Sequence, residues 1–193
     1  LCLDRAAELG RGLVPEERTV LLLAVLCHDL GKPATTRVEG GRIRSLGHEG
    51  ESARRTTEWL EALRLSERRI RAVTALVAHH LAPVLLVAQG AGPRAYRRLA
   101  RRLAEADVSI VSLERVARAD HWGRTTPDAA DRRFVAGDRF LAAAEAASVR
   151  QGIGRDVVSA RALMRRGVAA GPELGRLLAR CREIQDETGW ADP

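Results

Sequence analysis

The feature that most limits how this chain can fold is the apolar run from Thr19 to Leu30, TVLLLAVLCHDL. It is apolar on most faces of a helix, which is typical of a helix buried at the centre of a bundle. Pro15 and Glu16 stand before it, where proline and acidic side chains favour a first helical turn. Gly31 follows it as a helix end. The run therefore predicts a central helix that other helices must cover.

Most other segments also repeat apolar residues at helical spacing, and only residues 34–47 read differently. There, Val38 and Ile43 flank a Glu-Gly-Gly turn, which predicts a short hairpin or an irregular flap. The sequence predicts an all-α bundle of roughly seven to nine helices. We expect residues 1–125 to form its core and residues 126–193 a C-terminal helical extension, packed on that core as part of one structural unit.

Composition limits the setting of the protein. The chain has 193 residues, 46% of them hydrophobic, which is enough for a full core without disulfides. Its cysteines, Cys2, Cys27 and Cys181, lack C-x-x-C spacing, which argues against a cysteine zinc site and fits a cytoplasmic protein. No apolar run reaches the length of a membrane span, so we expect no membrane partner. Leu1 does not open a signal peptide, and the missing initiator Met suggests further N-terminal sequence.

The basic charges suggest a phosphate-bearing partner. The net charge is +7, and Lys32 is the one lysine among 32 basic residues. A surviving lysine in an arginine-rich chain hints at a site that needs an ammonium group, and chance is an equal alternative. The segment PRAYRRLARRLAEA reads as a basic helix that can contact RNA, with Tyr96 among its arginines. A solvated basic face is the alternative. The arginines concerned are Arg94, Arg97, Arg98, Arg101 and Arg102.

Histidines and aspartates collect at the ends of apolar segments. They are His28, Asp29, His48, His79, His80, Asp120 and His121. Imidazole and carboxylate together suit a divalent transition metal such as Mn, Fe, Co, Ni or Zn. Each histidine taken alone is more often a satisfied core residue, and an aspartate at a helix end can instead cap a neighbouring helix. The set therefore predicts a metal site only if its members converge.

The motifs HDLGK, GHE, HH and ADHWGR, in that order, resemble the HD superfamily of metal-dependent phosphohydrolases. The closest resemblance is to the HD domain of bacterial CCA-adding tRNA nucleotidyltransferases and of related RNA-repair phosphohydrolases. It implies that one or two divalent metals are bound by His28, Asp29, His48, His79, His80 and Asp120. It also implies that Asp29 bridges two metals and that Lys32 and Arg124 hold the substrate phosphate.

Two positions depart from the family pattern. The family has a histidine ahead of its first apolar stripe, which would fall just upstream of Leu1 and is not seen in this chain. His121 matches no family ligand, and we expect it to support a ligand or to face solvent.

The resemblance predicts a phosphohydrolase that acts on nucleotides or RNA ends, such as 2′,3′-cyclic phosphates or 2′-phosphates, with a metal-activated water. The alternative is a non-catalytic domain that helps a nucleotidyltransferase-type protein hold tRNA. The chain lacks the Gly-Ser and D-x-D carboxylates of a nucleotidyltransferase site and lacks a P-loop lysine motif. Nucleotidyl transfer or kinase activity would therefore need another region of the protein or a partner chain.

Overall fold

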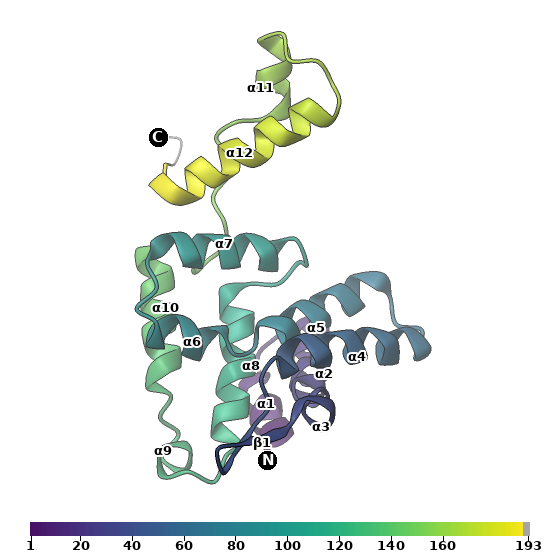
Figure 1. Cartoon of the computed structure of the whole chain (residues 1–193), viewed down its shortest axis with the longest axis vertical. Helices are drawn as coiled ribbons and strands as arrows, with labels where there is room; N and C mark the ends of the chain where they lie inside the picture. Colours follow the sequence, from purple (N-terminus) through teal and green to yellow (C-terminus); the bar gives the residue numbers. More distant parts are fainter. Residues whose placement is uncertain (191–193) are drawn as a thin grey trace.

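The computed structural model describes residues 1–190 and confirms the predicted all-α bundle (Figure 1). Its one sheet within those residues is a two-stranded antiparallel hairpin. The helices are α1 (Cys2–Leu9), α2 (Pro15–Cys27), α3 (Lys32–Thr35), α4 (His48–Ala62), α5 (Glu67–His79), α6 (Ala82–Ala88), α7 (Pro93–Ala104), α8 (Ile110–Trp122), α9 (Pro127–Ala130), α10 (Val135–Ala146), α11 (Ala160–Arg165) and α12 (Pro172–Thr188). The strands are β1 (Arg37–Glu39) and β2 (Arg42–Arg44).

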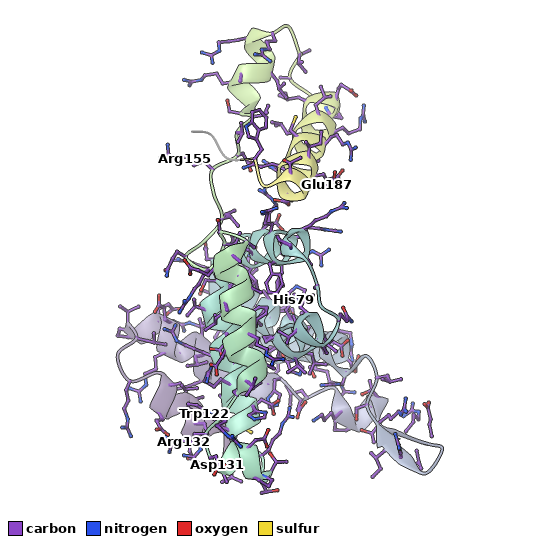
Figure 2. All side chains as sticks on the ribbon, turned by 90° about the vertical axis from the view of Figure 1, so that its left-hand side faces the viewer. His79, Trp122, Asp131, Arg132, Arg155 and Glu187 are labelled. Atoms are coloured by element: carbon purple, nitrogen blue, oxygen red, sulfur yellow. The ribbon has the colours of Figure 1, made fainter. Side chains whose placement is uncertain are left out.

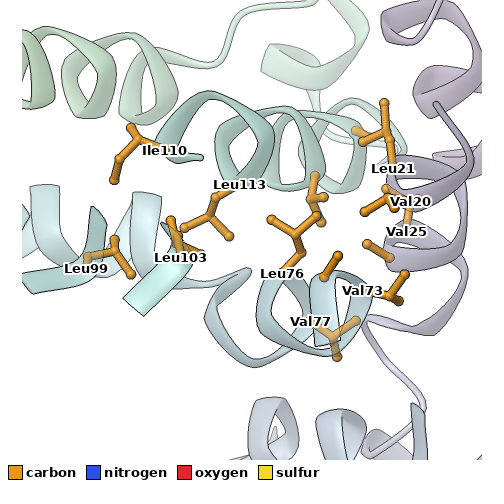
Figure 3. Close-up of a cluster of buried hydrophobic side chains, with 14 of the residues drawn as sticks. Val20, Leu21, Val25, Val73, Leu76, Val77, Leu99, Leu103, Ile110 and Leu113 are labelled. Atoms are coloured by element: carbon orange, nitrogen blue, oxygen red, sulfur yellow. The ribbon is translucent and has the colours of Figure 1, made fainter. Parts of the chain in front are cut away.

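Helices α2, α5 and α8 supply the centre of the apolar core, with α7 beside them (Figure 3). As the apolar run predicts, α2 is central, and it packs against α1, α5 and α8. Labelled core side chains from these helices are Val20, Leu21, Val25, Val73, Leu76, Val77, Leu99, Leu103, Ile110 and Leu113. One edge of the α2 segment stays open, because Leu26 is 47% exposed. Burial of this apolar surface holds the helix ends in fixed relative positions.

The helix starts follow local chemistry. Pro15 begins α2 with acidic residues in its first turn, as predicted. The Ser66 hydroxyl accepts a hydrogen bond from the Arg69 amide at the start of α5, and Ser109 does the same for Ser112 in α8. Each serine satisfies an amide that the first helical turn leaves unpaired.

The structure has more helices than the seven to nine expected, with twelve in residues 1–190. Three of them are short. Helix α3 is a single turn after the HD motif, α6 follows α5 directly, and α9 stands between α8 and α10. Pro33, Pro83 and Pro127 stand in the first turn of each, where a proline suits a helix start. Their sequences are too short for apolar periodicity to identify.

The apolar core continues past residue 125, where the extension was expected to begin. Helix α10 packs against α6, α7 and α8, and its Phe140 and Ala144 are fully buried. Helices α11 and α12 differ, because they stand beyond α7 at one end of the molecule (Figure 1). Of α12, only Leu174 and Asp186 are buried. The extension therefore contains one helix of the core and one outlying helix pair.

One stretch, Glu67–Ala88, is long and apolar enough to cross a membrane, with a mean hydropathy of 1.7. The prediction that no apolar run reaches this length is wrong by that measure. The stretch is two helices here, α5 and α6, joined through His80 and Leu81. Its most apolar window is 39% buried inside the bundle. Core helices have the same length and apolarity, so this stretch is weak evidence for a membrane span.

Candidate metal site

Four helix ends bring polar side chains to one place. His28 ends α2 and is followed by Asp29, and His48 is the first residue of α4. His80 ends α5, and Asp120 lies in the last turn of α8. The three histidines are buried, each less than 10% exposed. The packing of the core helices thus converges residues that are up to 92 positions apart in the sequence (28 to 120).

The converging atoms are carboxylate oxygens and imidazole Nε2 atoms. The His28 Nε2 atom lies 3.2 Å from Asp29 Oδ2 and 3.4 Å from Asp120 Oδ1. The His48 Nε2 atom lies 3.3 Å from Asp29 Oδ1 and 3.3 Å from the His80 Nε2 atom. One ligand atom each from Asp29, His48 and His80 falls within 4.8 Å of the others. This is a compact set of nitrogen and oxygen donors of the kind that transition metals take.

The backbone orients all three imidazole rings in the same way. Each ring places Nδ1 within hydrogen-bonding distance of the carbonyl three residues earlier, at 2.8 Å for His28 and 2.7 Å for His48 and His80. A neutral ring that donates from Nδ1 leaves its Nε2 lone pair free. Such hydrogen bonds to the outer nitrogen are common for metal-binding histidines. The rings of His48 and His80 therefore present lone pairs to each other.

A buried oxygen of Asp29 supports the fit to a cation. Within residues 1–190, Asp29 Oδ1 has no hydrogen-bond donor although it is buried. Its neighbours, the Nε2 atoms of His48 and His80, are acceptors in the tautomer that the backbone favours. A buried acceptor surrounded by acceptors is costly unless a positive charge lies among them. The donor set therefore fits a divalent metal.

The acidic side chains of the group hold their negative charge. Burial on its own raises the pKa of Asp29, but hydrogen bonds from His28 and Lys32 lower it well below the usual range. The pKa of Asp120 is lowered in the same way, against burial, by His28 and Arg124. Burial favours neutral His28, yet hydrogen bonds to Asp120 and Asp29 raise its pKa to about 10. The pKa of His80 is lowered, mainly by burial.

Two basic side chains border the group. Lys32 Nζ lies 2.6 Å from Asp29 Oδ2, and an Arg124 Nη atom lies 2.6 Å from Asp120 Oδ2. Their side chains are 47% and 48% exposed, so both remain open to solvent. Each cation has donors beyond the one used here. Lys32 thus lies at the exposed rim of the group.

The structure does not bring His79 to the group. His79 is one residue before His80, about 100° around the helix. Its pKa is lowered by burial and by the charge of Arg102 on α7. Within residues 1–190 it makes no hydrogen bond or ion pair with the predicted ligands. Of the six predicted ligands, His79 is the one that this geometry leaves out.

We expected His121 either to support a ligand or to face solvent, and the structure shows that it does not face solvent. Its ring stacks on Phe134 with centroids 4.7 Å apart, and its Nε2 atom lies 3.2 Å from Asp128. The side chain is 13% exposed. His121 thus helps to pack the segment after α8 against the end of that helix.

Gly31 and Ser52 are supporting residues that the sequence did not identify as such. The buried Gly31 amide donates a 2.8 Å hydrogen bond to Ser52 Oγ, and Ser52 is completely buried. Ser52 lies one turn after His48 on α4. A side chain at Gly31 would run into the His48 carbonyl oxygen and come within 2.6 Å of the Ser52 amide nitrogen. The missing side chain therefore lets the turn that carries Asp29 contact the helix that carries His48.

Most of the predicted RNA-binding arginines contact the C-terminal segment instead. Arg101 pairs with Asp186 and Asp156 at 2.8 and 2.9 Å, and Arg94 pairs with Glu187 at 2.6 Å. Arg97 donates to the Asp186 carbonyl.

Arg98 and Arg102 stay exposed and form no ion pair within residues 1–190. Tyr96 is 2% exposed and packs on Phe140, so it cannot stack on a base.

Comparison with known protein families matches residues 2–111 to the HD domain. That span covers more than half of the chain and includes His28, Asp29, His48 and His80, whereas Asp120 lies beyond it. Comparisons with curated proteins and with solved structures gave no significant match. The family match thus does not distinguish the tRNA nucleotidyltransferase group within the superfamily. HD domains bind divalent metals and are generally metal-dependent hydrolases. With this span and this donor set, the chain belongs to the HD domain family.

Proposed function

We propose that this protein is a metal-dependent phosphohydrolase that cleaves phosphomonoesters or phosphodiesters of nucleotides or RNA ends. The observation that carries the proposal is the buried Asp29 Oδ1 atom, which lacks a hydrogen-bond donor and lies 3.3 Å from His48 Nε2, in a group that His80 completes. Asp29, His48 and His80 would hold the metal, with His28 and Asp120 beside them. A bound divalent metal supplies a hydroxide at neutral pH and positive charge for the phosphoryl oxygens.

The chain's own side chains would orient the phosphate. Lys32 provides a point charge at the rim, and Arg124 provides a planar fork of donors. The carboxylates of Asp29 and Asp120 hold these two cations, and both carboxylates also contact His28 Nε2. Burial of the histidines keeps water away from one side of the group. Substrates with a 2′,3′-cyclic phosphate or a 2′-phosphate are proposed from the resemblance to RNA-repair enzymes.

Adjacent histidines provide a matched test. We expect about one or two transition ions per chain by elemental analysis, and hydrolysis of bis-p-nitrophenyl phosphate or 2′,3′-cyclic AMP. His80→Ala is expected to lose metal affinity by about 10-fold or more, whereas His79→Ala keeps it within about twofold. Asp29→Ala is expected to abolish turnover, with circular dichroism as the check on folding.

Metal-free protein with no turnover and tight tRNA binding would instead favour the non-catalytic alternative. Equal losses from His79→Ala and His80→Ala would contradict the site as drawn from this geometry.

A further inference from the structure

The hairpin between the site residues is exposed on both faces. All six residues of β1 and β2 are exposed, and Val38 and Ile43 are 73% and 77% exposed. In Figure 2 it extends from the body of the molecule at the lower right. A lone two-stranded hairpin is only marginally stable in water. This one therefore depends on its attachment at the base and does not contribute to the core.

The base of the hairpin is tied to the candidate site on both sides. The hydroxyls of Thr36 and Ser45 lie 2.7 Å apart and close the two ends. Thr36 also donates to the Lys32 carbonyl, and the Ser45 carbonyl lies 2.7 Å from His48 Nδ1. The base of the hairpin thus lies one helical turn after Lys32, at Thr36, and three residues before His48, at Ser45.

Its tight turn lets the hairpin reach outward. Gly40 and Gly41 both have positive φ, at 57° and 74°, as the two-residue turns of tight hairpins require. Strands rise about 3.3 Å per residue, so the four steps from Thr36 to Gly40 span roughly 13 Å. This length exceeds what a single phosphate group at the site would need.

One pair of charges works against the stability of the hairpin. Arg37 and Arg44 are directly opposite each other in the antiparallel register, whereas Arg42 is opposite Glu39. Like charges in directly opposed positions destabilise a strand pair. Within residues 1–190, neither arginine nor Arg42 forms an ion pair with a carboxylate, although Arg37 donates hydrogen bonds to the carbonyls of Ala34 and Thr36. Two arginines without a carboxylate partner, on a marginal hairpin beside a phosphate site, suit an external anion.

We propose that this hairpin is a substrate arm, in which Arg37 and Arg44 bind backbone phosphates of an oligonucleotide whose end lies at the metal site. The proposal rests on the phosphohydrolase function above and narrows its substrate class to chains with more than one phosphate. Arginine suits this role because its planar fork matches phosphate oxygens in pairs. A mainly electrostatic contact of this kind is independent of base sequence.

Binding of fluorescein-labelled oligouridylate to the full chain, followed by fluorescence anisotropy, tests the arm without requiring turnover. The double variant Arg37→Ser with Arg44→Ser is expected to weaken binding about 10-fold and to reduce the salt slope by about 1.4. The double variant Arg37→Lys with Arg44→Lys keeps the charge and is expected to restore most of the affinity. Unlabelled oligouridylate is expected to inhibit hydrolysis of bis-p-nitrophenyl phosphate competitively in the unaltered protein.

The matched control is Arg161→Ser with Arg165→Ser, which removes two exposed arginines from α11, at the other end of the molecule (Figure 1), and makes the same change in net charge. We expect its affinity for oligouridylate to stay within about twofold of the unaltered protein. An equal or larger loss in this control, or a loss below about twofold in the hairpin variant, would overturn the arm. Binding of polyglutamate with the same affinity as oligouridylate would overturn the selectivity of the arm for phosphates. Absence of metal or turnover would refute the proposed function, while the anisotropy result would still decide the arm.

Discussion

Substitution of Gly31 by alanine tests whether the site depends on close contact between two backbone segments. The added Cβ would overlap the His48 carbonyl oxygen and would come within 2.6 Å of the Ser52 amide and 2.9 Å of Glu51 Cβ. The first two neighbours are backbone atoms of α4 and cannot move aside as a flexible side chain can. The φ of Gly31 is −81°, so the backbone conformation itself suits alanine. Any loss of stability therefore comes from contact and not from backbone strain.

The magnitude follows from two effects. Overpacking in a close-packed interior costs about 1–3 kcal/mol. If the segments separate, the buried Gly31 amide also loses its 2.8 Å hydrogen bond to Ser52 Oγ, at about 1–3 kcal/mol. We expect Gly31→Ala to reduce the free energy of unfolding by about 2–6 kcal/mol. The Tm would fall by roughly 4–24 °C for a chain of this size. Ser52→Ala removes the hydrogen bond alone and should show only the second effect.

Gly50 provides the matched control because an added Cβ there meets nothing within 4 Å. It lies in α4 and is exposed. Alanine is favoured over glycine inside a helix by about 0.5–1 kcal/mol, so Gly50→Ala should stabilise the protein. Urea denaturation followed by circular dichroism measures both variants. A loss below about 1 kcal/mol for Gly31→Ala, or the same sign for both variants, would refute the close-contact reasoning.

Two further predictions concern other parts of the fold. Gly123→Ala should lower the free energy of unfolding by about 1–3 kcal/mol, measured by urea denaturation. The added Cβ would meet Cys2 Sγ and lie 2.8 Å from the Cys2 backbone nitrogen. The same change at Gly175, where an added Cβ meets nothing within 4 Å, should not lower it. Burial favours neutral Asp156, but hydrogen bonds from two arginines lower its pKa. Docking of α12 on α7 is therefore expected at neutral pH and lost as the pH falls below about 4. The rate of pepsin cleavage within α12 measures the loss of docking. Near pH 4, this cleavage should already be faster in Asp156→Asn than in the unaltered protein.

Most of the candidate site could be predicted from the sequence because its residues stand at the ends of helices that their own apolar patterns define. His28 and Asp29 follow the central run, and His80 follows the next strongly apolar helix. A buried helix with a polar end has to place that end where other helix ends meet. The choice between His79 and His80 was beyond the sequence, because either residue can face inward until the rotation of α5 is known. That rotation is fixed by the packing of Val73, Leu76 and Val77.

The supporting contacts were harder to predict for a different reason. Gly31 has the sequence signature of a helix end, and it lies in the turn between α2 and α3. The same glycine also has to leave room for α4, which is a requirement of tertiary contact and leaves no local pattern. Ser52 likewise reads as an ordinary helix residue. Its burial follows from its position one turn after His48, so the prediction of His48 as a ligand already implied that Ser52 would face the same way.

The arginines illustrate why charge alone did not locate a binding surface. On α7, the basic residues stand at spacings that place several of them on one side of the helix, which suits an external anion. The structure gives three of them partners in the C-terminal segment, including Asp186 at 2.8 Å from Arg101. A carboxylate more than 80 residues away in the sequence satisfies the same geometry as a phosphate. The hairpin arginines have no such carboxylate partner within residues 1–190, and Arg37 lies directly opposite Arg44 across the two strands. Absence of an internal carboxylate partner, combined with a cost to local stability, is therefore a sharper indicator of an external phosphate than the density of positive charge.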